Sequence, residues 1–315
     1  MMQFEVRLTW YTRTHEHMTQ DLQLLKSVPP CKENICAVVV TYFPDGGFCD
    51  RSKSIRDQVD HIVLVDNGSD AICLDCIQSL LSEPDVDLIQ NPTNLGVATA
   101  LNQGVRWAHE KGYAWALLFD QDTTPWPDTL QKLTKAYEEF PDKDRVAALG
   151  CNRFLKSPAP GMRRWTVAKT VITSGTLLSL QAAREIGPFR DEFFIDCVDF
   201  EFCLRARSMR FEIIEILEPM MSHSIGNPKP VRLLWFGART SNHRPWRWYY
   251  MVRNNVVLIR EYFWGEPVWA LQAAFLRIRD CAIVLLVENA RISKVKYMIL
   301  GFYDAIARRF DRVVL

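Results

Sequence analysis

Hydrophobic and polar residues follow two different patterns along the first 150 residues. Continuous apolar runs occur at Ile35–Thr41 and His61–Asp66, whereas Asn94–Lys111 has apolar residues at helical spacing. Continuous β-branched runs are typical of strands that are buried on both faces of a parallel sheet. The same patterns predict strands at Asp87–Gln90 and Tyr113–Phe119, a helix end over Ile55–Asp60 and a helix over Asp128–Phe140. Repeated β-α-β units of this kind predict a parallel sheet that binds its ligand at the carboxyl ends of the strands.

The pattern becomes less regular after residue 150. Val171–Leu180 is apolar with a Ser-Gly break, and Phe193–Met209 runs from an acidic turn into a helix. Phe211–Leu217 is a further predicted strand, and residues 231–315 are expected to be mostly helical. We therefore predict an α/β domain over 34–230, an N-terminal extension over 1–33 without clean periodicity, and a helical region rich in basic and aromatic residues over 231–315.

Charge is unevenly distributed, although the formal net charge of the 315 residues is only +1. Residues 1–202 carry a net charge of −8 and residues 203–315 a net charge of +9. A basic C-terminal third predicts an anionic partner. No run of five Lys or Arg is present, which argues against nucleic acid and favours the anionic surface of a membrane. The alternative is a solvated basic face over a packed aromatic core.

Cysteine usage and hydropathy predict a cytoplasmic protein without a membrane span. Nine Cys residues are scattered, and Cys73 and Cys76 form the single C-x-x-C pair, without the partners that a zinc site needs. The first 20 residues lack the apolar core of a signal peptide. The longest apolar stretches, Cys281–Val287 and Tyr297–Tyr303, are too short to cross a bilayer.

Candidate chemistry follows the predicted strands. Asp120 and Asp122 come directly after a buried strand, where two carboxylates can bind Mg²⁺ or Mn²⁺ and a substrate phosphate. Asp66 ends another strand, where its carboxylate could accept a hydrogen bond from a nucleoside or form an Asx turn with Asn67 and Ser69.

A second acidic cluster precedes the helix that begins near residue 199. Asp196, Asp199 and Glu201 lie beside Phe193-Phe194-Ile195, and crowding and desolvation would raise a carboxylate pKa toward that of a general base. The structural alternatives are a helix N-cap for Asp199 and a first-turn dipole partner for Glu201. His223 could be a third metal ligand if the fold brings it to Asp122.

The ordered set of motifs resembles family 2 glycosyltransferases of the GT-A fold, closest to bacterial rhamnosyltransferases of O-antigen and other surface polysaccharides. The matching segments are VDNGSD (65–70), NLGVATALNQG (94–104), LLFDQDT (117–123), TSGTLL (173–178), FFIDCVDFEFCLRAR (193–207) and HSIGN (223–227). The resemblance covers about residues 35–260. It implies a mainly parallel, Rossmann-like mixed sheet flanked by helices, with a helical C-terminal extension.

The resemblance also implies roles for individual residues. The nucleotide-sugar would be bound by Thr41, Asp66, Asn94, Gly96, Asp120 and Arg253. The divalent metal would be bound by Asp120, Asp122 and His223. Asp199 would be the catalytic base, in an acceptor pocket formed with Ser174, Gly175, Asp196 and Glu201.

The implied reaction is an inverting transfer of L-rhamnose from dTDP-rhamnose to a lipid-linked or polysaccharide acceptor. The enzyme would lie peripherally on the inner face of the cytoplasmic membrane. The alternatives are a UDP-hexose or UDP-galactofuranose donor, or a non-catalytic nucleotide-binding protein on this fold. A nucleotidyltransferase is disfavoured, because Thr41-Tyr42-Phe43-Pro44 replaces the Gly-rich basic loop expected after the first strand.

Overall fold

The structure, a computed structural model, describes residues 28–70, 77–151, 158–159, 161–223, 229–233, 236–240 and 242–314. Cys73 and Cys76, the first 27 residues of the extension and most of the 223–227 motif lie outside the described residues. So do the side chains of His223, Arg232, Trp235 and Arg239.

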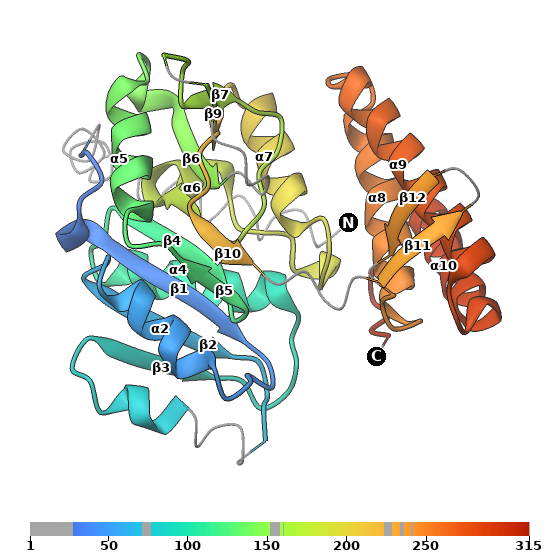
Figure 1. The fold of residues 1–315 in the computed structure, drawn as a ribbon, viewed down its shortest axis with the longest axis horizontal. Helices are drawn as coiled ribbons and strands as arrows, with labels where there is room; N and C mark the ends of the chain where they lie inside the picture. The colour runs from blue at the N-terminus through green and yellow to red at the C-terminus, as the bar shows by residue number, and fades with distance from the viewer. Residues whose placement is uncertain are drawn as a thin grey trace, which may run out of the picture.

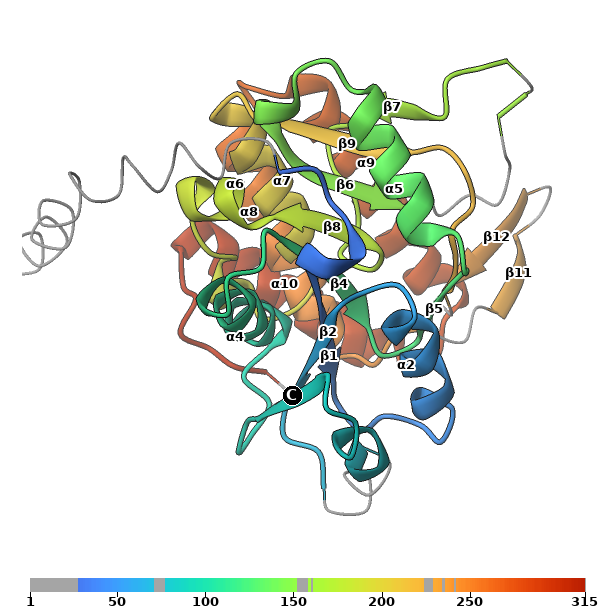
Figure 2. The ribbon, with the colours of Figure 1, turned by 90° about the vertical axis from the view of Figure 1, so that its left-hand side faces the viewer.

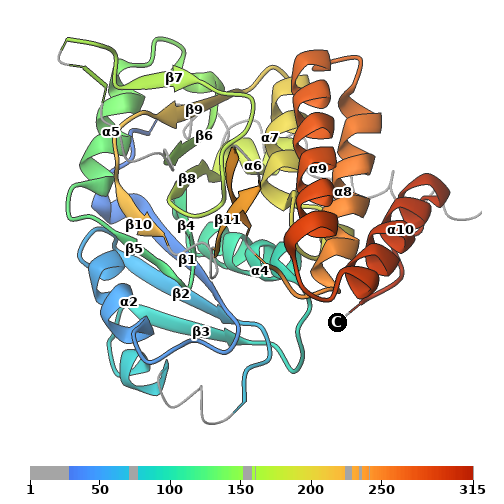
Figure 3. The ribbon, with the colours of Figure 1, turned by 45° about the vertical axis from the view of Figure 1, so that its right-hand side comes forward.

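One large mixed sheet forms the centre of the molecule, with strand order β3-β2-β1-β4-β8-β6-β9-β7 (Figures 2 and 3). The strands are β1 (Ile35–Thr41), β2 (His61–Asp66), β3 (Val86–Gln90), β4 (Trp115–Asp120), β6 (Val146–Cys151), β7 (Trp165–Val167), β8 (Thr176–Ser179) and β9 (Glu212–Ile216). Strands β1 to β4 run parallel, whereas β8 runs antiparallel to β4 and β6. The predicted mixed, mainly parallel α/β sheet is therefore confirmed.

Helices cover both faces of this sheet. Alternate residues of β1 point to opposite faces and therefore pack against different helices. Val38 packs toward α4 (Val97–Glu110), α6 (Leu180–Ile186) and α7 (Val198–Ser208), and Val39 packs toward α2 (Phe48–Arg56) and α5 (Thr129–Glu139). Short 3₁₀ turns lie at Lys32–Asn34, Lys143–Arg145 and Asp191–Phe193. The continuous hydrophobicity of β1 is thus the result of two separate cores.

A second, small sheet brings the segment around residue 222 back to the end of β4. Strand β10 (Met221–His223) pairs antiparallel with β5 (Thr123–Pro125), and His223 lies opposite Thr123. This pairing joins two segments that lie about 100 residues apart in the sequence.

The C-terminal region forms a helical unit beside the sheet (Figure 1). It begins with a hairpin of β11 (Lys229–Leu233) and β12 (Phe236–Thr240), so the expectation of helix at residue 231 was wrong there. Helices α8 (Arg247–Tyr262), α9 (Pro267–Val287) and α10 (Arg291–Ala307) follow (Figure 3). Within the described part of the chain, no helix is long and apolar enough to cross a membrane.

Helix α8 is the buried member of this unit. Trp248, Tyr249 and Tyr250 are at most 2% exposed, and Arg253 is fully buried. The sequence predicted a membrane-facing surface for the basic and aromatic C-terminal region, but in α8 the aromatic residues form a packed core, which was the alternative.

Close packing of α10 on α8 depends on Gly301. A Cβ atom at this position would lie 2.3 Å from the carbonyl oxygen of Tyr249, which as backbone of a packed helix cannot move away. We therefore expect Gly301→Ala to lower the free energy of unfolding by about 1–3 kcal/mol, measured by denaturant titration. Gly265→Ala is the control, since its nearest atom is 4.0 Å away, and equal effects of the two substitutions would contradict this account.

Candidate functional site

Three parallel strands end together at one edge of the sheet. Thr41 at the end of β1 pairs with Asp66 of β2, and Val40 pairs with Asp120 of β4. The edge therefore carries the side chains that the sequence placed at strand ends, as expected of the binding edge of an open α/β sheet.

The carboxylate of Asp66 is fully buried and is used to shape its own loop. It accepts hydrogen bonds from Thr41 Oγ1 (3.0 Å), Ser69 Oγ (2.6 Å), Ser69 N (2.9 Å) and Gly68 N (3.2 Å). These bonds form the Asx-type turn that the sequence allowed as an alternative. Thr41 and Asp66 thus shape the loop, and direct contact of either side chain with a nucleoside stays a prediction.

Asn67 and Asn94 join this loop to the one that follows β3. Asn67 Nδ2 donates to Asn94 Oδ1 (3.0 Å), which also accepts from Gly96 N (2.9 Å). Gly96 has φ +89°, and a Cβ there would lie 2.8 Å from the carbonyl oxygen of Phe194. Only glycine fits this close approach, which brings the 94–96 loop to the acidic segment at 193–199.

The Asp-Gln-Asp segment is fixed by hydrogen bonds from both sides. Ser174 Oγ donates to Asp120 Oδ2 (3.0 Å) and accepts from Asp120 N (2.8 Å). Gln121 accepts from Tyr42 N (2.7 Å) and donates to Tyr42 O (3.1 Å). Gln121 was not predicted as a site residue, although its place between two acids is the signal that points to it.

The buried positions of Ser174 and Gly175 change their expected role. Ser174 is fully buried against Asp120, and Gly175 N donates to Leu118 O (2.8 Å) within the sheet. Both residues therefore support the strand that carries Asp120, rather than forming the wall of an acceptor pocket.

Asp120 and Asp122 provide hard oxygen donors of the kind that Mg²⁺ and Mn²⁺ prefer. The β10–β5 pairing sets the backbone of His223 opposite Thr123, next to Asp122, which is the proximity that its predicted role requires. Among the side chains that the structure describes, no group of three His, Cys, Asp or Glu forms a metal cluster. The residues present fit a divalent cation held by two carboxylates.

Arg247, the first residue of α8, lies among these acids. It donates to both carboxylate oxygens of Asp196, over 3.0 and 2.9 Å. Burial alone would lower the pKa of Arg247, but the negative charge of Asp196, and then of Asp120 and Asp122, outweighs burial and raises it. Asp196 and the Asp-Gln-Asp segment therefore share one electrostatic environment around Arg247.

Among the residues that the structure describes, no Lys or Arg forms an ion pair with Asp199. It lies in the first turn of α7, one residue past the first helical position, so it is not the N-cap. Its oxygens accept from the backbone N–H groups of Thr173 (3.1 Å) and Phe200 (2.9 Å). Burial, with a smaller contribution from the charges of Asp120 and Asp196, raises the pKa of Asp199 to about 6 despite these hydrogen bonds.

The loop that carries Asp196 has a strained backbone. Phe194, Asp196 and Cys197 all have positive φ, between 61° and 66°, which costs of order 1 kcal/mol or more for each non-glycine residue. Asn254 Nδ2 donates to the carbonyl oxygens of Phe193 (2.9 Å), Ile195 (2.9 Å) and Asp196 (2.8 Å). Asn254, which sequence analysis did not assign to the site, therefore stabilises this conformation.

Arg253 supports the same loop and is not placed to bind phosphate. Its side chain is fully buried, and its guanidinium donates to the carbonyl oxygen of Glu192, to Asn254 Oδ1 and to the hydroxyl of Tyr249. The nucleotide-binding role expected of Arg253 is wrong in this geometry, because its donors are directed at protein atoms.

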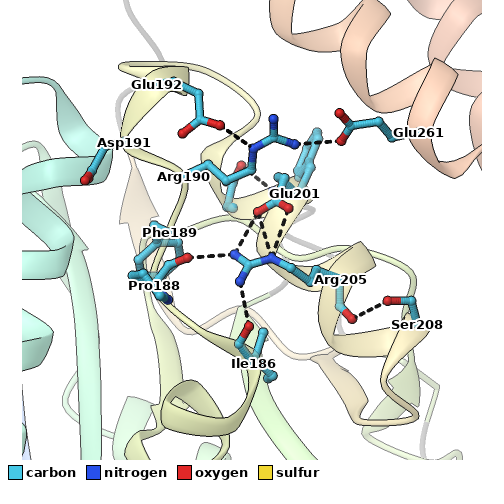
Figure 4. Close-up of polar contacts among 12 residues, drawn as sticks. Ile186, Pro188, Phe189, Arg190, Asp191, Glu192, Glu201, Arg205, Ser208 and Glu261 are labelled. Atoms are coloured by element: carbon cyan, nitrogen blue, oxygen red, sulfur yellow. Dashed lines mark hydrogen bonds and ion pairs between the residues drawn. The ribbon is translucent and has the colours of Figure 1, made fainter. Parts of the chain in front are cut away.

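Glu201 also departs from its expected place in the acceptor pocket. It is 1% exposed and accepts from Arg205 Nε (3.0 Å), Arg205 Nη2 (2.9 Å) and Tyr262 Oη (3.2 Å). Arg205 in turn donates to the carbonyls of Ile186 and Pro188 (Figure 4). Glu201 therefore ties α7 to the preceding turn and to α8.

Comparisons with known proteins agree with this architecture. Residues 37–178 match the family model described as Glycosyl transferase family 2. Over 289 residues the chain is 29% identical to the dTDP-rhamnosyl transferase RfbF of Shigella flexneri, covering 87% of this chain and 95% of that protein.

Two solved structures share the fold at low sequence identity. The mannosyltransferase PcManGT of Pyrobaculum calidifontis, in complex with GDP-Man and Mn²⁺, is 16% identical with a TM-score of 0.54, covering 93% of this chain and 94% of that one. TarS 1-349 of S. aureus, in complex with UDP-GlcNAc, is 14% identical with a TM-score of 0.54, covering 88% of each chain. The GT-A fold expected from the sequence is confirmed.

The raised pKa of Asp199 predicts that this residue destabilises the folded protein at neutral pH. Its folded pKa of about 6 exceeds the ordinary value of 3.8, so the folded state holds the proton more tightly. The contribution of protonated Asp199 to the free energy of unfolding is therefore fully present below about pH 4 and is lost as pH rises through 6. We expect Asp199→Asn to raise the free energy of unfolding by about 2 kcal/mol at pH 7.5 and by much less at pH 4.

Thermal unfolding of both proteins across pH 4–8 measures this difference. Glu201→Gln is the control, since it breaks a buried ion pair and should destabilise the protein at every pH where the pair is charged. A constant offset between Asp199→Asn and the parent protein would contradict the assignment.

Proposed function

We propose that the chain, a glycosyltransferase whose residues 37–178 match the glycosyl transferase family 2 model, transfers L-rhamnose from dTDP-rhamnose with inversion. The acceptor is a lipid-linked or polysaccharide glycan of the cell surface. The reaction takes place at the inner face of the cytoplasmic membrane.

The choice of rhamnose rests on the similarity to RfbF, a dTDP-rhamnosyl transferase, which extends over 95% of that protein. The solved structures with this fold were obtained with GDP-Man and UDP-GlcNAc, so the fold alone does not select the sugar. UDP-hexose and UDP-galactofuranose are therefore the alternatives that a donor experiment must separate.

The donor side of the site is the edge formed by β1, β2 and β4. The loops held by Asp66 and Asn94 form the nucleoside side, and Asp120 and Asp122 would hold a divalent cation. When bound, that cation neutralises negative charge on the diphosphate. Ser174 holds the carboxylate of Asp120 and Gln121 fixes the segment between the two acids, which lowers the need to reorganise this segment during the reaction.

The placement of Asp199 is the observation that carries the mechanism. A carboxylate with a pKa of about 6, without a cationic partner among its hydrogen bonds and within the electrostatic influence of Asp120, is suited to accept a proton near neutral pH. Asp199 takes the proton of an acceptor hydroxyl, whose oxygen attacks the anomeric carbon. The bond to the diphosphate breaks on the opposite face and dTDP leaves, so one displacement inverts the configuration.

Asp196 and Arg247 form the neighbouring acceptor side. Asp196 belongs to the strained loop that precedes Asp199, and Arg247 forms a bidentate ion pair with it. We assign them to positioning of the acceptor, because the carboxylate of Asp196 is already paired with the guanidinium of Arg247.

A donor screen tests the proposed substrate. The donors are dTDP-rhamnose, UDP-glucose, UDP-galactose, UDP-galactofuranose and UDP-N-acetylglucosamine. With Mg²⁺ or Mn²⁺, we expect dTDP-rhamnose to give the largest thermal shift and the highest rate of hydrolysis without acceptor. Asp120→Asn and Asp122→Asn should each remove the metal-dependent part of the shift. A stronger response to a UDP-sugar would leave the mechanism intact and remove the rhamnose assignment.

Substitution of Asp199 tests the base. We expect Asp199→Asn to lower kcat by about 10²–10⁴-fold while donor affinity stays nearly unchanged, because the residue acts on the acceptor. The parent enzyme should lose activity as pH falls through about 6, since protonation disables the base. Asp196→Asn should mainly raise KM for the acceptor. If Asp199→Asn keeps turnover within tenfold, Asp199 is not the base, and Asp196 and Glu201, which are both held in ion pairs, become the candidates.

A further inference from the structure

Exposed apolar side chains are concentrated on the C-terminal helices. Among the described residues, 14 of the 21 exposed large hydrophobic residues lie between Trp264 and Val313. Trp264 itself, in the turn before α9, is 89% exposed. Single exposed apolar residues are normal, but a concentration of this kind marks an interaction surface.

Helix α9 has an apolar stripe along its outer side. Six of the seven exposed large apolar residues of α9 lie on one face of the helix: Val268, Leu271, Phe275, Ile278, Leu285 and Leu286; the seventh, Leu276, lies to the side. Its other side is buried through Ala270 and Val284, the latter in a cluster with Trp248 of α8. The helix is therefore apolar on its outward face in addition to its packed face.

Helix α10 repeats this arrangement. Met298, Gly301 and Ala305 are buried on one side of the helix, and Gly301 lies against α8. The exposed apolar residues are Ile292, Ile299, Phe302, Tyr303 and Ile306. We call the two outward stripes of α9 and α10 the docking face.

The charges around the docking face are almost all positive. Between residues 264 and 314 the exposed charged side chains are Arg279, Arg291, Lys296, Arg308, Arg309, Arg312 and Asp311. The other acids of this segment are less exposed: Glu288 pairs with Lys294, Asp280 with Arg279, Glu266 with Lys169 and Asp304 with Arg312. Six exposed cations against one exposed acid complement an anionic surface.

We propose that the docking face binds the surface of an anionic phospholipid bilayer, with α9 and α10 lying in the plane of the interface. Apolar stripes bordered by Arg and Lys, with an exposed Trp at one end, are suited to this position. A second copy of the chain fits less well, because a two-fold interface would bring the same cationic borders together.

This assignment deepens the proposed membrane location and rests on it, but it changes the residues involved. Helix α8 packs against α9 and α10 and, through Arg247 at its first turn, holds Asp196 in the acceptor side of the site (Figure 3). Docking of α9 and α10 therefore fixes the distance of the acceptor side from the lipid surface.

Vesicle flotation tests the proposal with the full chain. We expect the protein to float with vesicles of phosphatidylcholine and phosphatidylglycerol, and much less with phosphatidylcholine alone or at high salt. Combined Phe275→Gln, Ile278→Gln, Ile299→Gln and Phe302→Gln should weaken binding at least about tenfold, as should Arg279→Gln, Lys296→Gln and Arg308→Gln together. The matched control, Met162→Gln with Val167→Gln, removes exposed apolar residues elsewhere and should bind as the parent does.

The outcomes separate the possible partners. The proposal is overturned if the parent protein does not float, or if the apolar variant floats as well as the control. It is also overturned if light scattering without lipid shows a dimer that the apolar variant dissociates, since a second copy then covers the face. Hydrolysis of dTDP-rhamnose without vesicles should be equal in all variants, so its absence in the parent would count against the proposed donor and leave the docking result valid.

Discussion

A buried set of hydrogen bonds between α8 and the loop at 193–197 is the constraint on which the catalytic edge depends. Asn254 satisfies three carbonyl groups of a loop in which three non-glycine residues have positive φ. Each buried carbonyl left without a donor would cost about 1–3 kcal/mol, comparable to the strain in the loop itself. The loop conformation, and with it the position of Asp196, is therefore stable only while α8 is packed in place.

The same constraint divides the acids of the site into distinct roles. Arg247 forms an ion pair with Asp196, and the charges of Asp120 and Asp122 help to raise its pKa. The hydrogen bonds that Asp199 accepts come from the backbone N–H groups of Thr173 and Phe200. The acids of the site therefore differ in the groups around them, and burial raises the pKa of Asp199 to about 6. This difference is what a metal-assisted leaving group and a separate general base require.

Helices α8, α9 and α10 show how similar compositions serve opposite purposes. Aromatic and basic residues of α8 that resemble a membrane anchor in sequence are buried, and Arg253 bonds to backbone carbonyls. The outward stripes of α9 and α10 carry the exposed hydrophobicity instead. Periodicity gives the faces of a helix, but which face meets the core depends on the partners that pack against it.

The sequence by itself determined the strands β1 and β2 to the residue, the αβ alternation and the strand-end positions of Asp66 and Asp120, because these follow from local periodicity and burial on both faces. Tertiary structure alone decided the rest. In the tertiary structure Arg253 and Glu201 are buried, and Ser174 binds Asp120. Gln121 and Asn254 stabilise the loops of the site. A side chain's role depends on which atoms lie within hydrogen-bonding distance, and those atoms come from segments distant in the chain.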